Sequence, residues 1–329
     1  MASAAFPLAG TFIAAALFAA PPVRAEPPAL ALPIDCRVGV DCEIQNHVDR
    51  DPGPAARDYQ CGSRTYQGHT GVDFRLPDLV RQRQGVAVLA AAEGRVLRVR
   101  DGVADVSVRA TGTDAVEGLE CGNGVVIGHP DFFETRYCHL AQGSVAVRPG
   151  DDVKAGHTLG RVGLSGRTEY PHLHFSVHQG PSVVDPFAHG APQGACGAGR
   201  SLWRPELRES LVYKQRAVLN TGFAARPLNM AAIEERPEAP TAGAAALLAY
   251  ARGIGLKAGD VQTVTLKGPD GAVLATNTGE PLSRDQAQNM VFAGVRRPAQ
   301  GWRKGRYVGE YVVRNGGQVV LSRSFELGL

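Results

Sequence analysis

One short stretch of the chain, residues 172–177, alternates strictly between apolar and polar side chains. Its apolar residues occupy every second position: Leu173, Phe175 and Val177. A period of two is typical of a β-strand with one buried face. The intervening positions include His172 and His174. Because successive side chains of a strand point to opposite faces, both histidines are predicted to project from the face opposite the core, about 7 Å apart.

Further β-type runs surround this strand. They are short and bounded by glycine turns: Val86–Leu89, Val96–Val99 and Val125–Ile127. No long segment between residues 59 and 200 has the helical period, so we predict an all-β domain there. A polar, glycine-containing stretch, Asp101–Glu120, interrupts the strands. We expect it to form a loop on the wall of a cleft, where substrate selectivity could reside.

The last part of the chain, residues 213–329, carries two hairpin patterns and no catalytic motif. In Val264–Leu274 two apolar runs flank a Pro-Asp-Gly turn, and in Tyr307–Phe325 they flank Asn-Gly-Gly. We expect an immunoglobulin-like β-sandwich of about 100 residues, with Trp302 and Tyr311 in its core. Such a module could bind a glycan or a protein partner, but we prefer to interpret it as a spacer.

Residues 1–25 are predicted to be a signal peptide. An alanine-rich apolar run ends at a Pro-Pro pair, and Val-Arg-Ala at positions 23–25 fits a small-residue cleavage site, although the usual basic start is missing. A membrane anchor is the weaker alternative, because the run is short and contains proline and glycine. We therefore expect a periplasmic or extracellular protein with no stable membrane anchor after cleavage. The net charge of +3 gives no reason to expect nucleic-acid binding.

Six cysteines agree with export, because an even number in an exported protein indicates disulfides. Cys121 and Cys138 flank a predicted hairpin that turns near Pro130, so they are the best-supported pair. The pairing of the others remains open: Cys36, Cys42, Cys61 and Cys196. No Cys-x2-Cys spacing occurs, which argues against cysteine ligands for zinc. Residues 26–58, which contain two of these cysteines, are expected to form a disulfide-tied cover on the following domain.

Two further histidines and an aspartate give the paired histidines a chemical context. His69 and Asp73 would lie about 13 Å apart in a straight strand, but Gly68 and Gly71 allow the chain to bend and bring them together. His139 ends a predicted hairpin strand. Two histidines and a carboxylate form one of the standard three-ligand sets of catalytic zinc.

Together, these motifs resemble the signature of the lysostaphin/LytM-type zinc endopeptidases. The resemblance covers residues 59–187 and includes the connecting pieces, among them Ala90–Val96, which is similar to the first core hairpin of the family, and Leu164-Ser165-Gly166. It implies an antiparallel LytM-like β-sheet domain, over residues 59–200. It also implies peptide bonds of bacterial peptidoglycan stems as the substrate.

The resemblance also implies a role for each site residue. His69, Asp73 and His174 would bind Zn2+, while His139 and His172 would be catalytic. Zinc lowers the pKa of a water molecule toward about 7 and polarises a carbonyl, and a histidine with a pKa near 6.5 can move the protons. A second histidine can hydrogen-bond the oxyanion. Which histidine does which stays open, so we assign the pair jointly.

Several alternatives remain open. The family includes members that have lost metal ligands and activate other hydrolases, so a catalytically silent regulator or wall-binding module is the competing hypothesis; the five intact positions argue against it. A third hypothesis is a protease that acts on extracellular proteins. Whether a protein activator controls the enzyme also stays open. Asn46 or His47 could occupy the open metal position in a latent form. Tyr66 could polarise the substrate, although a structural role is the preferred interpretation.

Overall fold

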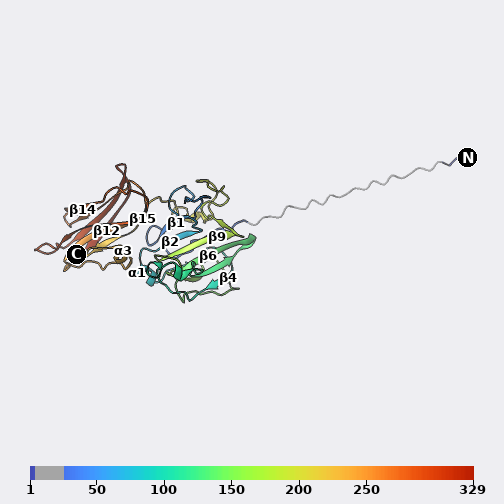
Figure 1. The fold of residues 1–329 in the computed structure, drawn as a ribbon, viewed down its shortest axis with the longest axis horizontal. Coiled ribbons are helices and arrows are strands. Elements are labelled where there is room, and N and C mark those ends of the chain that lie inside the picture. Colours follow the sequence, from blue (N-terminus) through green and yellow to red (C-terminus); the bar gives the residue numbers. More distant parts are fainter. Residues whose placement is uncertain (4–25) are drawn as a thin grey trace.

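The computed structural model describes residues 1–3 and 26–329. The predicted signal peptide therefore lies outside the described residues, apart from its first three. Figure 1 shows two β-rich parts side by side, with the C-terminus in the second. In the described part of the chain, helices are too short or too polar to cross a membrane.

An eight-stranded antiparallel sheet is the frame of the first part. Its strands run in the order β1-β2-β9-β6-β5-β4-β7, with β10 also paired to β9. Their bounds are β1 (Glu43–Asn46), β2 (Val72–Arg75), β4 (Gly94–Arg100), β5 (Asn123–Gly128), β6 (Phe133–Leu140), β7 (Asp152–Val153), β9 (His172–Gln179) and β10 (Ser182–Val184). The predicted all-β, antiparallel architecture is confirmed.

The predicted alternation of residues 172–177 is present in β9. Leu173, Phe175 and Val177 have 0% exposed surface and belong to the core, while the histidines lie on the other face of the sheet. The predicted hairpin of Cys121 and Cys138 is also present, because β5 and β6 pair and the short 3-10 helix η2 (Pro130–Phe132) turns the chain between them.

The predicted first hairpin around Ala90–Val96 is wrong. β3 (Ala87–Leu89) pairs with β8 (Thr158–Arg161) in a separate two-stranded sheet, and β4 pairs with β5 and β7. Ala90 and Ala91 are fully buried, so the chain crosses from the small sheet to the large one through the core instead of reversing at the surface. Small side chains permit this close passage.

Residues 26–58 are more than a cover. Leu30 and Ile34 lie in the main core, and β1 extends the large sheet by pairing with β2. The place of β1 in the sheet could not be predicted from its polar sequence, because Glu43 and Gln45 are buried through polar contacts and not through apolar packing.

All six cysteines form disulfides. The predicted Cys121–Cys138 bond is present, and the other pairs are Cys36–Cys42 and Cys61–Cys196. The bond between Cys121 and Cys138 ties the chain before β5 to the strand that ends near His139.

Removing the Cys61–Cys196 disulfide is expected to lower the free energy of unfolding more than removing Cys36–Cys42. The first closes a loop of 135 residues and the second a loop of 6, and loop-closure entropy then gives about 5 and about 2 kcal/mol, respectively. Urea denaturation of the two double serine variants measures this difference. Equal losses would show that chain entropy does not govern the contribution of these bonds.

The second part is a β-sandwich. A sheet of order β11-β12-β15 packs against one of order β14-β13-β16-β17, and Tyr311 lies fully buried between them, while Trp302 is only partly buried. The two predicted hairpins are β13–β14 and β16–β17. The bounds are β11 (Ala217–Ala224), β12 (Ala246–Leu256), β13 (Val261–Lys267), β14 (Val273–Thr278), β15 (Gln286–Arg296), β16 (Arg306–Asn315) and β17 (Gln318–Gly328).

The helices in the described residues are short and lie in connections. They are α1 (Leu79–Arg83), α2 (Val108–Thr111) and α3 (Met230–Glu234), with the further 3-10 turns η1 (Asp114–Val116) and η3 (Pro205–Leu207). Both α2 and η1 lie within Asp101–Glu120, so the predicted loop contains two helical turns.

Candidate metal centre

The strand register places two of the predicted ligands opposite each other. Asp73 in β2 pairs with His174 in β9, so the two side chains share one face of the sheet. His69 lies in the loop before β2, where Gly68 has a φ of +74°. A side chain at Gly71 would lie 2.7 Å from the His174 ring, so only glycine allows this loop to approach.

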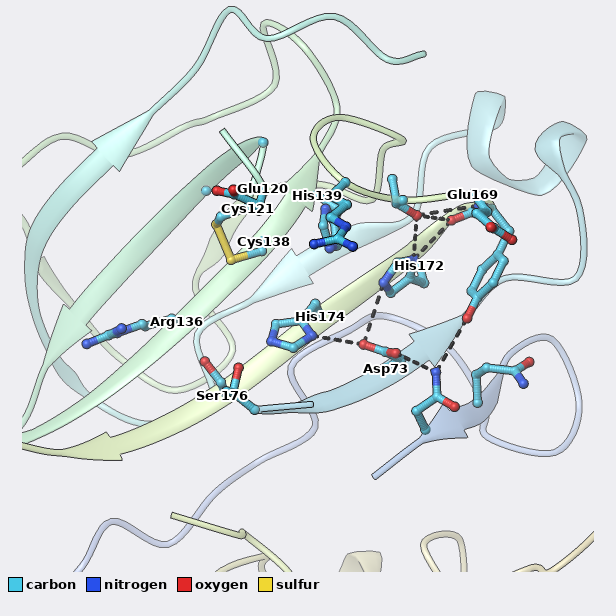
Figure 2. A pocket seen from close by; sticks show the side chains of 18 of the residues that line it. Asp73, Glu120, Cys121, Arg136, Cys138, His139, Glu169, His172, His174 and Ser176 are labelled. Atoms are coloured by element: carbon cyan, nitrogen blue, oxygen red, sulfur yellow. Dashed lines mark hydrogen bonds and ion pairs between the residues drawn. A yellow bond between two sulfur atoms is a disulfide. The ribbon is translucent and has the colours of Figure 1, made fainter. Parts of the chain in front are cut away.

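The donor atoms of these three residues converge. His69 Nε2 lies 3.1 Å from Asp73 Oδ1 and 3.1 Å from His174 Nδ1, and His174 Nδ1 lies 3.0 Å from Asp73 Oδ1. Tetrahedral zinc with bonds of 2.0–2.1 Å holds its ligand atoms about 3.3 Å apart. The spacing therefore suits such an ion, and Figure 2 shows His174 and Asp73 turned toward each other.

The hydrogen bonds of His69 strengthen the fit to a cation. Its Nδ1 lies 2.7 Å from the carbonyl oxygen of His47, which can only accept a proton. In a neutral ring this leaves a lone pair on Nε2, facing the carboxylate of Asp73. Two acceptors at hydrogen-bond distance need a proton or a metal ion between them. A histidine that binds a metal through one ring nitrogen usually donates from the other to a carbonyl or carboxylate, as His69 Nδ1 does to His47 O.

The electrostatics of the cluster agree with this arrangement. Burial alone would raise the pKa of Asp73, but the adjacent imidazoles of His69 and His172 and the hydrogen bonds from His174 and His69 hold it well below its usual range. Burial opposes charge on His69 as well, yet the charge and hydrogen bond of Asp73 raise its pKa. Asp73 is therefore an anionic centre for the surrounding nitrogens.

His139 is held by its backbone and by one ring nitrogen. It follows Cys138 at the end of β6 and has a φ of +64°, a left-handed conformation that is uncommon for a residue other than glycine. Its backbone N–H donates to Cys121 O at 2.8 Å, and ring Nδ1 donates to Ser165 O at 2.8 Å. The remaining nitrogen, Nε2, therefore carries the lone pair.

His172 also carries its proton on Nδ1, but with different hydrogen-bond partners. Its Nδ1 donates to Tyr170 O at 3.0 Å and lies 3.0 Å from Thr168 Oγ1. Its Nε2 lies 3.5 Å from Asp73 Oδ1, and its ring centroid lies 4.6 Å from that of His139. The predicted pair thus lies together beside the ligand cluster.

Burial favours the neutral form of both of these histidines. Burial, followed by the neighbouring imidazoles of His172 and His174, lowers the pKa of His139 well below its usual value. Burial likewise lowers the pKa of His172, although Asp73 acts in the opposite direction. Two neutral imidazoles with lone pairs on Nε2 can each accept a proton.

The two residues considered for a latent form have other contacts. The Asn46 amide donates to Asp73 Oδ2 at 2.8 Å, so it binds the outer oxygen of a candidate ligand. The His47 ring lies among the aromatic rings of Tyr59, Phe187 and Tyr213. Its contribution to the cluster is the carbonyl group that accepts from His69, a role that the sequence did not reveal.

The cluster opens into a groove with a volume of about 1330 Å³. Val108, Arg109 and Thr113 line it, so the Asp101–Glu120 stretch forms part of a wall as predicted. Tyr66 also lines the groove and is 54% exposed, and its ring centroid lies 4.5 Å from that of His69, so both interpretations of this residue remain predictions. His178 lines the groove too, but its Nε2 lies 3.2 Å from Ser176 Oγ and outside the ligand cluster.

Comparison with known proteins relates one segment of the chain to a family. Residues 67–186 match peptidase family M23. DD-carboxypeptidase/endopeptidase Mpg of Neisseria meningitidis serogroup B is 33% identical over 128 residues, which are 39% of this chain and 24% of that protein. Peptidoglycan DD-endopeptidase ShyB of Vibrio cholerae is 32% identical over 109 residues, which are 33% of this chain and 20% of that protein.

These matches cover only part of each protein. The chain spans about a quarter of the length of the curated relatives it matches. Among solved structures, the catalytic domain of the antimicrobial peptidase lysostaphin from Staphylococcus simulans is 22% identical, with 44% of this chain and 89% of that one covered and a TM-score of 0.30.

Proposed function

We propose, on the premise that residues 67–186 form a domain of peptidase family M23, that this protein is a zinc-dependent endopeptidase acting on peptide bonds of bacterial peptidoglycan. The observation that carries the proposal is the convergence of donor atoms from His69, Asp73 and His174 at 3.0–3.1 Å. The relative named as a peptidoglycan DD-endopeptidase supports the choice of substrate.

The residues of this chain divide into two roles in the proposed reaction. His69, Asp73 and His174 would hold the zinc ion, which would polarise the scissile carbonyl and lower the pKa of a water molecule. His139 and His172 would act at Nε2: one accepts the proton of the attacking water, and a proton returns to the leaving amine. The other imidazole would have to take up a proton from solvent at Nε2 before it could donate a hydrogen bond to the developing oxyanion.

The site also bears on the competing hypothesis of a catalytically silent regulator. The five predicted residues lie close together: His69, Asp73 and His174 form the donor cluster, with His172 beside Asp73 and His139 beside His172. A protein selected only to activate another hydrolase has no need for two buried, neutral imidazoles beside a three-donor cluster. We therefore propose an active enzyme in the cell envelope, periplasmic or extracellular, with control by a protein activator as a further hypothesis.

Purified peptidoglycan is expected to be cleaved by the protein in a chelator-sensitive way. Each hydrolysed peptide bond adds one water to the mass of the fragments, so mass spectrometry locates the bond. Added zinc should restore cleavage after chelation. A parallel digestion of an unfolded extracellular protein separates the peptidoglycan substrate from general proteolysis. Absence of chelator-sensitive cleavage from both substrates would contradict the enzyme proposal.

A further inference from the structure

One wall of the groove belongs to the C-terminal sandwich. Gln286, Ala287 and Gln288 line the same groove as the candidate metal ligands, and they are the first three residues of β15. β15 is an edge strand of its sheet and lies on the side of the sandwich that faces β1 and β2 (Figure 1). The catalytic part alone would therefore present an incomplete groove.

Polar contacts fix this segment against the large sheet. Gln45 in β1 donates from Nε2 to Ala287 O at 3.0 Å, and Arg75 in β2 donates from Nη2 to Gln288 Oε1 at 3.0 Å. Just before β15, Asp285 Oδ2 accepts from the hydroxyl of Ser63 at 2.6 Å. Three separate hydrogen bonds along four consecutive residues define the position of this wall.

Arg75 is the main link between the wall and the metal centre. It is fully buried, lies two residues after Asp73 in β2 and pairs with His172 in β9. Its guanidinium donates to Glu234 Oε1 at 2.9 Å, and Glu234 also pairs with the buried Arg252 of the sandwich. A shared carboxylate between two buried arginines holds the two parts together, because removing one partner would leave buried charge uncompensated.

Tyr170 extends this contact to the catalytic side of the groove. The Arg75 guanidinium lies 3.8 Å from the centre of the Tyr170 ring. The backbone carbonyl of Tyr170 accepts from His172 Nδ1 at 3.0 Å, and its hydroxyl lies 3.4 Å from Asn46 Nδ2. Gln288, Arg75 and Tyr170 thus form a continuous floor from the sandwich to His172.

We infer that Gln286 and Gln288 form a binding subsite for the amide groups of a peptide strand that extends from the metal centre toward the sandwich. A glutamine amide offers both a carbonyl acceptor and N–H donors, which complement the C=O and N–H groups of a peptide. Gln288 Oε1 accepts a hydrogen bond from Arg75, which leaves the NH2 group of Gln288 as a donor for the peptide. The inference rests on the proposed function, and it assigns the sandwich a part in substrate binding in place of the spacer role.

Substitution of Gln286 by alanine tests the subsite. The probe is the mixture of cross-linked muropeptides that a muramidase releases from purified peptidoglycan. Binding is measured by calorimetry in the full chain carrying His172→Ala, which stops the proposed turnover. Gln286→Ala should raise Kd about fivefold, the effect of losing one or two hydrogen bonds. The matched control is Gln318→Ala, an exposed glutamine at the start of β17 and outside the groove, which should leave Kd within about twofold.

A second variant separates hydrogen bonding from packing. Gln286→Glu keeps the length of the side chain but replaces the N–H donors, so it should weaken binding at least as much as Gln286→Ala. Equal Kd values for Gln286→Ala, Gln286→Glu and Gln318→Ala, or no measurable binding by any form, would overturn the subsite. Weaker binding by both Gln286 variants without chelator-sensitive cleavage by wild type would keep the subsite and reject the proposed enzyme.

Discussion

Replacing His174 with alanine is expected to remove both the proposed metal binding and the proposed hydrolytic activity. His174 Nδ1 is one of three donors, at 3.0 Å from Asp73 Oδ1 and 3.1 Å from His69 Nε2. Loss of a residue that only supports a ligand already costs about 10–100-fold in metal affinity, so loss of a ligand should cost more. Zinc per chain, measured by elemental mass spectrometry after dialysis, should fall from about one toward zero.

His178 provides a matched control for this experiment. It lies four residues later in β9, on the same face of the strand, and it also lines the groove. Its Nε2 interacts with Ser176 Oγ, at 3.2 Å, and not with the donor cluster. His178→Ala should therefore retain zinc. A His174→Ala protein that binds one zinc ion and cleaves peptidoglycan would contradict the ligand set.

Substitutions of His172 and His139 are expected to have the opposite pattern: zinc is retained, while turnover falls. Removing a general acid or base typically costs about 10²–10⁴-fold in rate. Both imidazoles have Nδ1 committed to a carbonyl oxygen, so their Nε2 atoms are the proton-carrying positions that the substitutions remove. Measurement of zinc content and of cleavage rate on the same preparation separates the two effects.

The substitution at position 139 needs a residue that tolerates its backbone conformation. Alanine at a φ of +64° is strained, whereas asparagine adopts left-handed conformations more readily. His139→Asn therefore isolates the loss of the imidazole from a change of backbone, and its melting temperature should stay near that of wild type. Loss of zinc together with activity in both His172→Ala and His139→Asn would reject the separation of metal-binding and proton-transfer residues.

The parts of the site that sequence could predict depend on local periodicity. The alternation in residues 172–177 places His172 and His174 on one face, and this follows from a rule that needs no knowledge of the rest of the chain. Cys121 and Cys138 were likewise predictable, because a hairpin brings its two ends together. The bend between His69 and Asp73 followed from the two glycines beside them.

The contacts that support the site were not predictable, because their partners are distant in sequence. Arg75 is fully buried in β2, and its partner Glu234 is 159 positions away. Arg252 interrupts the buried strand β12 and would ordinarily be placed at a surface. Only the assembled interface supplies the carboxylate that makes these buried charges acceptable. Backbone carbonyls orient His69, His139 and His172, and the pattern of side chains along the sequence does not predict such contacts.

The buried contact between His69 and Asp73 links the stability of this chain to the cation that lies between them. Without a metal ion, a proton between His69 Nε2 and Asp73 Oδ1, 3.1 Å apart in a buried site, fills this role, and a bound cation would replace that proton. A ligand that binds only the folded state adds stability by mass action, about 1.4 kcal/mol for each tenfold excess of free ion over its dissociation constant. A metal ion bound by the proposed ligands would then stabilise the folded state as well as serve the proposed reaction.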